Sequence, residues 1–89
     1  MLFLNWNEVR ATFPNNWVLF EVVEAYSKAG KRHIEDLAVV DSFAEWLEAV
    51  KKYKEARSIN PYGEFYFFHT DREELEILES DYLSLRGVY

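Results

Sequence analysis

The stretch Trp17-Val-Leu-Phe-Glu-Val-Val-Glu-Ala-Tyr26, followed by a polar turn and then by His33-Ile-Glu-Asp-Leu-Ala-Val-Val40, decides the fold of this chain. Both runs are rich in β-branched and aromatic residues, which is typical of strands. Between them, Lys28-Ala-Gly-Lys31 predicts a tight turn in which the glycine supplies the positive φ that hairpin turns require. The sequence therefore predicts a long β-hairpin with arms over about 17–27 and 32–40.

The first arm of this hairpin is apolar on both faces over residues 17–23. A strand that is buried on both faces is usually central in its sheet. The outer part of the hairpin, from Tyr26 to Asp36, has few apolar residues and carries charges of both signs. We expect this outer part to extend beyond the core and to be available to a partner or a second subunit.

Two capping patterns predict helices on either side of the hairpin. Asn5 with Glu8 three residues later indicates a short first helix, which Pro14 ends. Ser42 with Glu45 repeats the pattern and predicts a second helix over 42–57. Apolar residues recur along that helix at helical spacing and form one broad stripe that we expect to be buried: Phe43, Trp46, Leu47, Val50 and Tyr53.

The last third of the chain begins with a strongly aromatic strand, Glu64-Phe-Tyr-Phe-Phe-His-Thr70. Thr70 and Glu73 then form another capping box, and the apolar spacing over Leu75–Leu85 favours a final helix that Gly87 ends. The alternative is that Leu75–Glu79 is a fourth strand after a turn at 71–74.

These elements predict a single α+β domain over residues 1–89, in the order helix, strand, strand, helix, strand, helix. We expect a small three-stranded, mainly antiparallel sheet in the order 2-1-3, because this order makes the first strand central. Placing the third strand beside the second would instead give a mixed sheet.

Composition limits the classes of function. The net charge is −6, and seven of the sixteen acidic residues but two of the ten basic residues lie from Ser58 onward. This balance argues against nucleic acids and membrane surfaces as partners. The chain has no cysteine, no basic leader at Met1 and no apolar run long enough to cross a bilayer, so a cytoplasmic location is expected.

No catalytic, cofactor-binding or metal-binding motif is recognisable. His33 lies near Glu35 and Asp36, and His69 lies near Asp71, so a small enzyme with a His/carboxylate site is one alternative. Consecutive strand residues point in opposite directions, however, so the run at 69–71 is not a catalytic triad. We therefore expect no enzyme, no cofactor and no metal, and no small-molecule substrate is identifiable.

A second alternative is binding of single-stranded nucleic acid through the aromatic residues of the third strand. Such stacking platforms are framed by lysine and arginine, whereas Glu64, Asp71, Glu73 and Glu74 flank this strand. The aromatic residues are better explained by core packing.

The chain resembles a group of short prokaryotic proteins that carry a (Tyr/Phe)-Pro-x-x-Trp-Val opening before a β-hairpin and a helix. The resemblance rests on Thr12-Phe-Pro14, Trp17-Val-Leu-Phe-Glu21, Glu48-Ala-Val, Tyr53 and the strand Glu64–Thr70. Asn15 stands where the group usually has glycine, and the hairpin here is longer. The resemblance covers about the first two-thirds of the chain, and it implies a fold but no functional residue.

These observations favour a small cytosolic interaction or regulatory protein that acts through protein–protein contacts. Sixteen aromatic residues are more than so small a core needs, so we expect some of them at an interface, with the protein forming a homodimer through its sheet. The candidate interaction surface consists of Tyr26, Lys28, Lys31, Arg32, His33, Tyr66 and Phe68.

Overall fold

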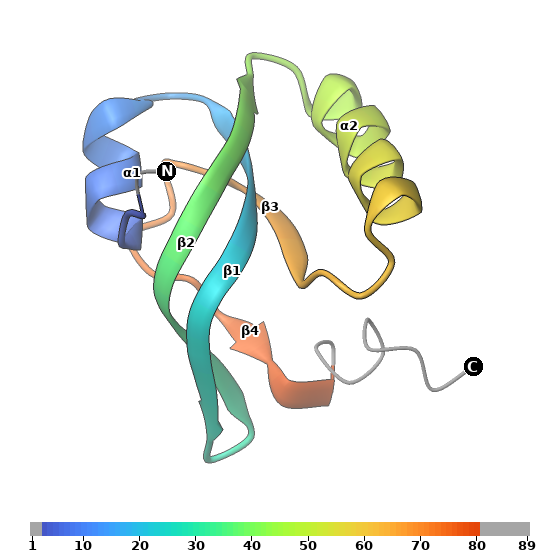
Figure 1. Cartoon of the computed structure of the whole chain (residues 1–89). Helices are drawn as coiled ribbons and strands as arrows, with labels where there is room; N and C mark the ends of the chain where they lie inside the picture. The colour runs from blue at the N-terminus through green and yellow to red at the C-terminus, as the bar shows by residue number, and fades with distance from the viewer. Residues whose placement is uncertain (1–2, 81–89) are drawn as a thin grey trace.

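The computed structural model describes residues 3–80 of the chain. In chain order its elements are α1 (Trp6–Thr12), β1 (Trp17–Lys28), β2 (Lys31–Phe43), α2 (Trp46–Ile59), β3 (Phe65–His69) and β4 (Ile77–Leu78). The strands form one antiparallel sheet in the order β3-β1-β2-β4. Figure 1 shows α1 and α2 on opposite sides of this sheet. The predicted α+β class is confirmed.

The prediction of a three-stranded sheet in the order 2-1-3 needs correction, because a fourth strand extends the sheet beyond β2. β4 pairs with β2 at Lys31 and Arg32, and Leu4 makes an isolated bridge to Leu37 on the same side of β2. β1 lies between β3 and β2. This central place explains why β1 is apolar on both faces over its first half.

The hairpin turn consists of Ala29 and Gly30, which have φ angles of 53° and 77°. Positive φ at both positions is characteristic of the type I′ turn, whose twist matches that of the two arms. The pairing of β1 with β2 shifts register between Leu19 and Phe20, between Val22 and Glu24, and between Glu24 and Ala25. Such bulges increase the twist of a hairpin.

The predicted start of the second helix at Ser42 is wrong. Ser42 and Phe43 belong to β2, where they pair with Val18 and Trp17 of β1. α2 begins four residues later, after Glu45, and no side chain caps it. In the folded chain Ser42 pairs with Val18 of β1. This strand pairing takes the place of the helix cap that the local sequence predicts.

The predicted final helix is wrong over residues 75–78, whereas Glu79 and Ser80 are helical as predicted. The hydroxyl of Thr70 accepts a hydrogen bond from the Asn16 amide (3.1 Å) and donates one to the Phe13 carbonyl (2.8 Å), so it caps no helix. Ile77 and Leu78 form β4, as the alternative of a fourth strand proposed. The rest of the predicted helix, including Leu85 and Gly87, lies outside the described residues.

The first helix is confirmed with its capping box. The Asn5 side chain accepts a hydrogen bond from the Glu8 amide, and the Glu8 carboxylate accepts one from the Asn5 amide, both at 2.9 Å. Trp6 and Val9 on the inner side of α1 are buried.

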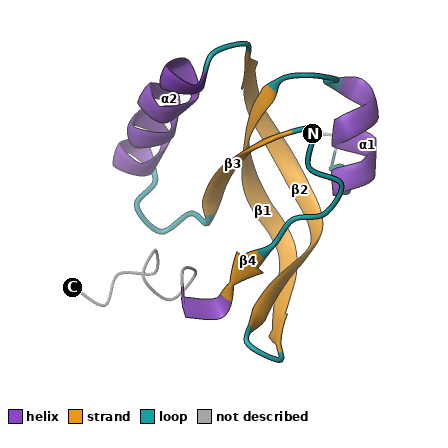
Figure 2. Cartoon of the chain, turned by 180° about the vertical axis from the view of Figure 1, so that it is seen from behind, coloured by secondary structure: helices purple, strands orange, loops and turns teal. Residues whose placement is uncertain are grey.

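One core lies between the sheet and α1. Its buried members are Trp6, Val9, Val18, Phe20, Leu37, Tyr66 and Ile77. The segment between β3 and β4 completes this layer, since it passes beside α1 on its way to the far end of β2 (Figure 2). The Trp6 indole donates to the Arg72 carbonyl and the Arg10 guanidinium donates to the Thr70 carbonyl, each at 2.9 Å, so this segment is fastened to α1.

A second apolar layer lies between the opposite face of the sheet and α2. Ala49 of α2 is fully buried, and the Tyr53 ring meets the Phe67 ring edge-on with centroids 5.4 Å apart. Phe67 also contacts Trp17 of β1, with ring centroids 6.2 Å apart. α2 therefore packs over β3 and β1 together.

Candidate interaction surfaces

The outer edge of β3 is one boundary of the sheet. The Val22 amide donates to the Glu64 carbonyl and the Thr70 amide donates to the Asn16 carbonyl, at 2.8 and 2.9 Å. In an antiparallel pair the backbone groups of successive residues point alternately toward and away from the partner strand. Tyr66 and Phe68 therefore face β1, whereas the backbone N–H and C=O groups of the residues between them face outward.

The outward groups of β3 belong to Phe65, Phe67 and His69. The His69 carbonyl accepts a hydrogen bond from the Arg72 amide at 3.1 Å. The backbone groups of Phe65 and Phe67 have no hydrogen-bond partner within residues 3–80. Natural edge strands are commonly protected by charged residues, proline or a bulge, and residues 65–68 contain none of these.

The far end of the hairpin carries four of the predicted surface residues. Tyr26 and His33 lie opposite each other on β1 and β2, and their rings stack with centroids 5.0 Å apart and an interplanar angle of 15°. Tyr26 is 46% exposed. Lys28 and Lys31 flank the turn and are exposed. The structure thus brings these four residues together at the tip.

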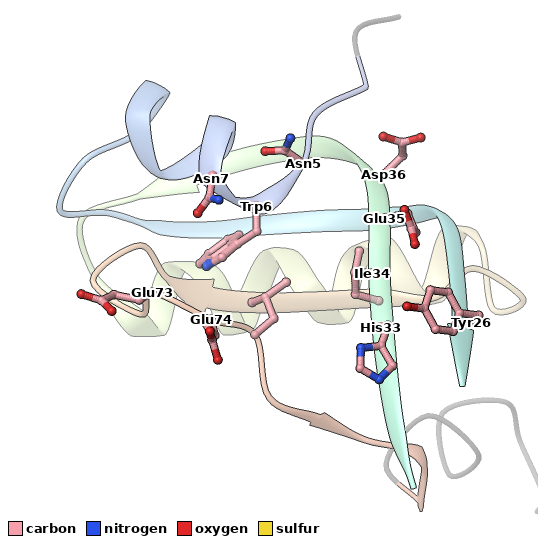
Figure 3. A pocket seen from close by; sticks show the side chains of 11 residues that line it. Asn5, Trp6, Asn7, Tyr26, His33, Ile34, Glu35, Asp36, Glu73 and Glu74 are labelled. Carbon is pink, nitrogen blue, oxygen red and sulfur yellow. The ribbon is translucent and has the colours of Figure 1, made fainter. Parts of the chain in front are cut away.

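A cleft of about 590 Å³ lies beside this part of the hairpin (Figure 3). It is bordered by the start of α1, by β2 and by the segment before β4. Its lining residues are Asn5, Trp6, Asn7, Tyr26, His33, Ile34, Glu35, Asp36, Glu73, Glu74 and Leu75. Four of these are carboxylates, so the cleft is acidic. Within residues 3–80, no three His, Cys, Asp or Glu side chains are grouped closely enough to hold a metal ion.

Arg32 has a different role from its neighbours on the hairpin. Its guanidinium donates two hydrogen bonds to the Glu64 carboxylate, at 2.8 and 3.0 Å, and both side chains are largely buried. The Tyr66 hydroxyl donates to the same carboxylate at 2.7 Å. This network reaches from β2 across β1 to the residue before β3. Arg32 therefore links the outer part of the hairpin to the start of β3.

The other two predicted surface residues, Tyr66 and Phe68, lie in the core on the α1 side. Tyr66 is 8% exposed, and Phe68 packs against the same cluster. Both rings contact Phe20, with centroid distances of 6.0 and 6.3 Å. Neither ring is presented to solvent as a platform on which bases could stack.

His69 makes a local contact at the end of β3. Its Nδ1 accepts a hydrogen bond from the Asp71 amide at 3.1 Å, and an Asp71 carboxylate oxygen lies 3.5 Å from the same nitrogen. Both contacts are local, and they shape the turn after β3.

α2 carries exposed apolar residues that the sequence pattern placed in the core. Trp46 is 50% exposed and Leu47 is 62% exposed. Ile59, which lies outside the predicted stripe, is 77% exposed near the end of the helix. The broad stripe predicted for this helix is wider than the strip of helix that touches the sheet. The sequence already indicated this exposure. Trp46 and Leu47 are adjacent, and adjacent residues on a helix point in different directions, so they cannot both face the sheet directly.

Comparisons of the chain with protein-family models, curated proteins and solved structures gave no match. Among residues 3–80, no helix has the length and apolar character needed to span a membrane.

Proposed function

We propose that this protein acts through protein–protein contacts and associates with a second copy of itself through the outer edge of β3. The observation that carries the proposal is the pair of outward-facing residues Phe65 and Phe67, whose backbone groups have no partner among residues 3–80. An unpaired strand edge is a template for one more strand.

The proposal includes a cytoplasmic setting and a regulatory or docking role. The absence of cysteine from all 89 residues supports the first. The second is supported by the small size of the chain and by its acidic, aromatic composition.

Sedimentation equilibrium combined with amide hydrogen exchange tests the proposal. We expect a dimer at micromolar concentration, with the Phe65 and Phe67 amides protected from exchange in the dimer and exposed on dilution. The Tyr66 and Phe68 amides are matched controls in the same strand, because they face β1 and stay protected at every concentration. A chain that remains monomeric at about 100 µM, well above usual specific affinities, would refute self-association.

A further inference from the structure

The orientation of α2 on the sheet can be derived from three of its contacts. Ala49 is fully buried and marks the side that faces the sheet. A groove of about 280 Å³ lies beside one flank of the helix. Ala56 and Ile59 of α2 line it, and on the sheet it reaches Val40 of β2 as well as Glu21 of β1 and Phe65 at the start of β3. This flank of α2 therefore faces β2.

The opposite flank of α2 lies over the outer edge of β3. With 3.6 residues per turn, the positions on this flank are Trp46, Val50, Tyr53 and Arg57. The contact of the Tyr53 ring with Phe67 on β3 agrees with this placement. Trp46 is half exposed, and Val50 and Tyr53 are partly exposed. An apolar stripe of Trp46, Val50 and Tyr53 thus runs along the helix above the unpaired strand edge, and Arg57 ends it by donating a hydrogen bond to the Tyr53 hydroxyl at 3.2 Å.

Antiparallel pairing of β3 with β3 of a second copy determines the position of this apolar stripe in the dimer. Phe67 is the middle one of the three outward-facing residues, so a two-fold axis beside Phe67 pairs Phe67 with its symmetry mate and Phe65 with His69 of the second copy. Such an axis is perpendicular to the sheet and keeps both α2 helices on the same face. Within one chain α2 contacts β3 and β1 most and β2 less, so its axis lies between β3 and β1 or over β1, and the two helix axes would lie about two to three strand spacings apart, roughly 10–14 Å. The lower end of this range matches the interaxial distance of packed helices, about 8–10 Å.

We infer that the occupant of this surface is a second copy of the chain, and that the flanks of the two antiparallel α2 helices that carry Trp46, Val50 and Tyr53 pack together while the two β3 strands pair beneath them. Tyr53 lies near the two-fold axis, and Trp46 of each helix lies toward the C-terminal end of the other. This inference rests on the proposed self-association and specifies its geometry. The resulting dimer has one continuous sheet with a helix pair on one face.

The charges around β3 favour the antiparallel arrangement. The segment after β3 is acidic, with Asp71, Glu73 and Glu74, whereas residues 60–63 before it are uncharged. A two-fold axis at Phe67 places the acidic end of one strand against residues 60–63 of the other, beside Glu64, whose charge is paired with Arg32. Parallel pairing would place the two acidic ends together, which is unfavourable at a net charge of −6 per chain.

Strand pairing alone would bury too little surface for a stable dimer, so the apolar stripe on α2 is also needed. Stable specific interfaces bury about 1,200–2,000 Å² in total, which is more than two paired five-residue strands supply. The large apolar side chains of Trp46 and Tyr53 lie where additional contact is needed, and tryptophan and tyrosine are enriched among the residues that dominate binding energy.

Two neighbouring substitutions in α2 test the inference. Trp46→Glu places a charge in the helix pair, and we expect the dimer dissociation constant to rise by at least about tenfold in sedimentation equilibrium. Leu47→Glu is the matched control. Leu47 is more exposed than Trp46 and points away from the sheet, so this variant should keep the dissociation constant within about twofold.

Cross-linking provides a second measurement that does not depend on Trp46. The sequence has no cysteine, so Lys54→Cys and Glu48→Cys each introduce a single thiol at an exposed position of α2. A bis-maleimide with a spacer of about 8–10 Å, matched to the expected helix separation, should join two Lys54→Cys chains, because position 54 lies near the axis. It should not join two Glu48→Cys chains, because position 48 lies on the flank toward β2.

The outcomes separate this inference from the proposed function. A monomeric wild-type chain contradicts both. A dimer with protected Phe65 and Phe67 amides that tolerates Trp46→Glu, or that cross-links at position 48 rather than 54, preserves pairing at β3 and overturns the helix contact. Equal weakening by Trp46→Glu and Leu47→Glu also overturns it, since the effect would then follow added charge alone.

Discussion

At the scale of single residues, the ion pair between Arg32 of β2 and Glu64, the residue before β3, is the clearest determinant of stability. Glu64 accepts hydrogen bonds from Arg32 and Tyr66 in a largely buried position. Glu64→Gln removes the carboxylate charge that Arg32 contacts, and removing one member of a buried pair typically costs about 3–5 kcal/mol. We expect the free energy of unfolding in urea to fall by about 3 kcal/mol, with Tyr66→Phe costing about 1 kcal/mol.

The double variant Arg32→Met, Glu64→Met is the control for this prediction. It removes both charges together, and replacing a whole buried pair by apolar residues is often nearly neutral. Its stability should therefore exceed that of Glu64→Gln. If the double variant is the less stable of the two, the loss in Glu64→Gln does not arise from an uncompensated buried charge.

At the scale of elements, two capping patterns that look equivalent in the sequence have different outcomes. Asn5 with Glu8 caps α1, whereas Ser42 with Glu45 lies in and just after β2. We expect Asn5→Ala to lower the free energy of unfolding by about 1 kcal/mol. Ser42→Ala should change it by less than about 0.5 kcal/mol, because Ser42 caps nothing. Paired urea denaturation curves check this, and equal losses in the two variants would contradict the assigned roles.

The difference between these patterns shows what the sequence could and could not predict. The hairpin, its turn and the first helix depend on local residues, so their positions follow from the pattern around Gly30 and Asn5. The structural roles of Ser42 and Thr70 depend on residues far away in the sequence. Ser42 pairs with Val18 of β1, and the Thr70 hydroxyl donates a hydrogen bond to the Phe13 carbonyl. Local spacing carries no information about such partners.

The same reason limits prediction of the candidate site. A surface that includes Tyr26 and His33 could be predicted, because the outer hairpin is visibly polar. The open edge at Phe65 and Phe67 depends on which strand ends the sheet. The exposure of Trp46 depends on which side of α2 meets the sheet. Both are properties of the assembled fold.

At the scale of the whole molecule, self-association links stability to concentration. A folded dimer that dissociates on unfolding is stabilised by mass action as the protein concentration rises. We expect the urea midpoint to increase between about 1 and 100 µM protein, a range that brackets a micromolar dissociation constant. Trp46→Glu should show a smaller increase over the same range. A wild-type midpoint that is constant with concentration would indicate that the folded unit is a monomer.

The contacts that fasten α1 to the segment between β3 and β4 also determine when the protein can fold during synthesis. Trp6 bonds to Arg72, and Ile77 belongs to the same core as Val9. A ribosome adds roughly 5–20 residues per second, so several seconds separate the synthesis of α1 from that of its covering segment. The β1–β2 hairpin can form in that interval, while Trp6 and Val9 remain accessible to chaperones until the last part of the core has been made.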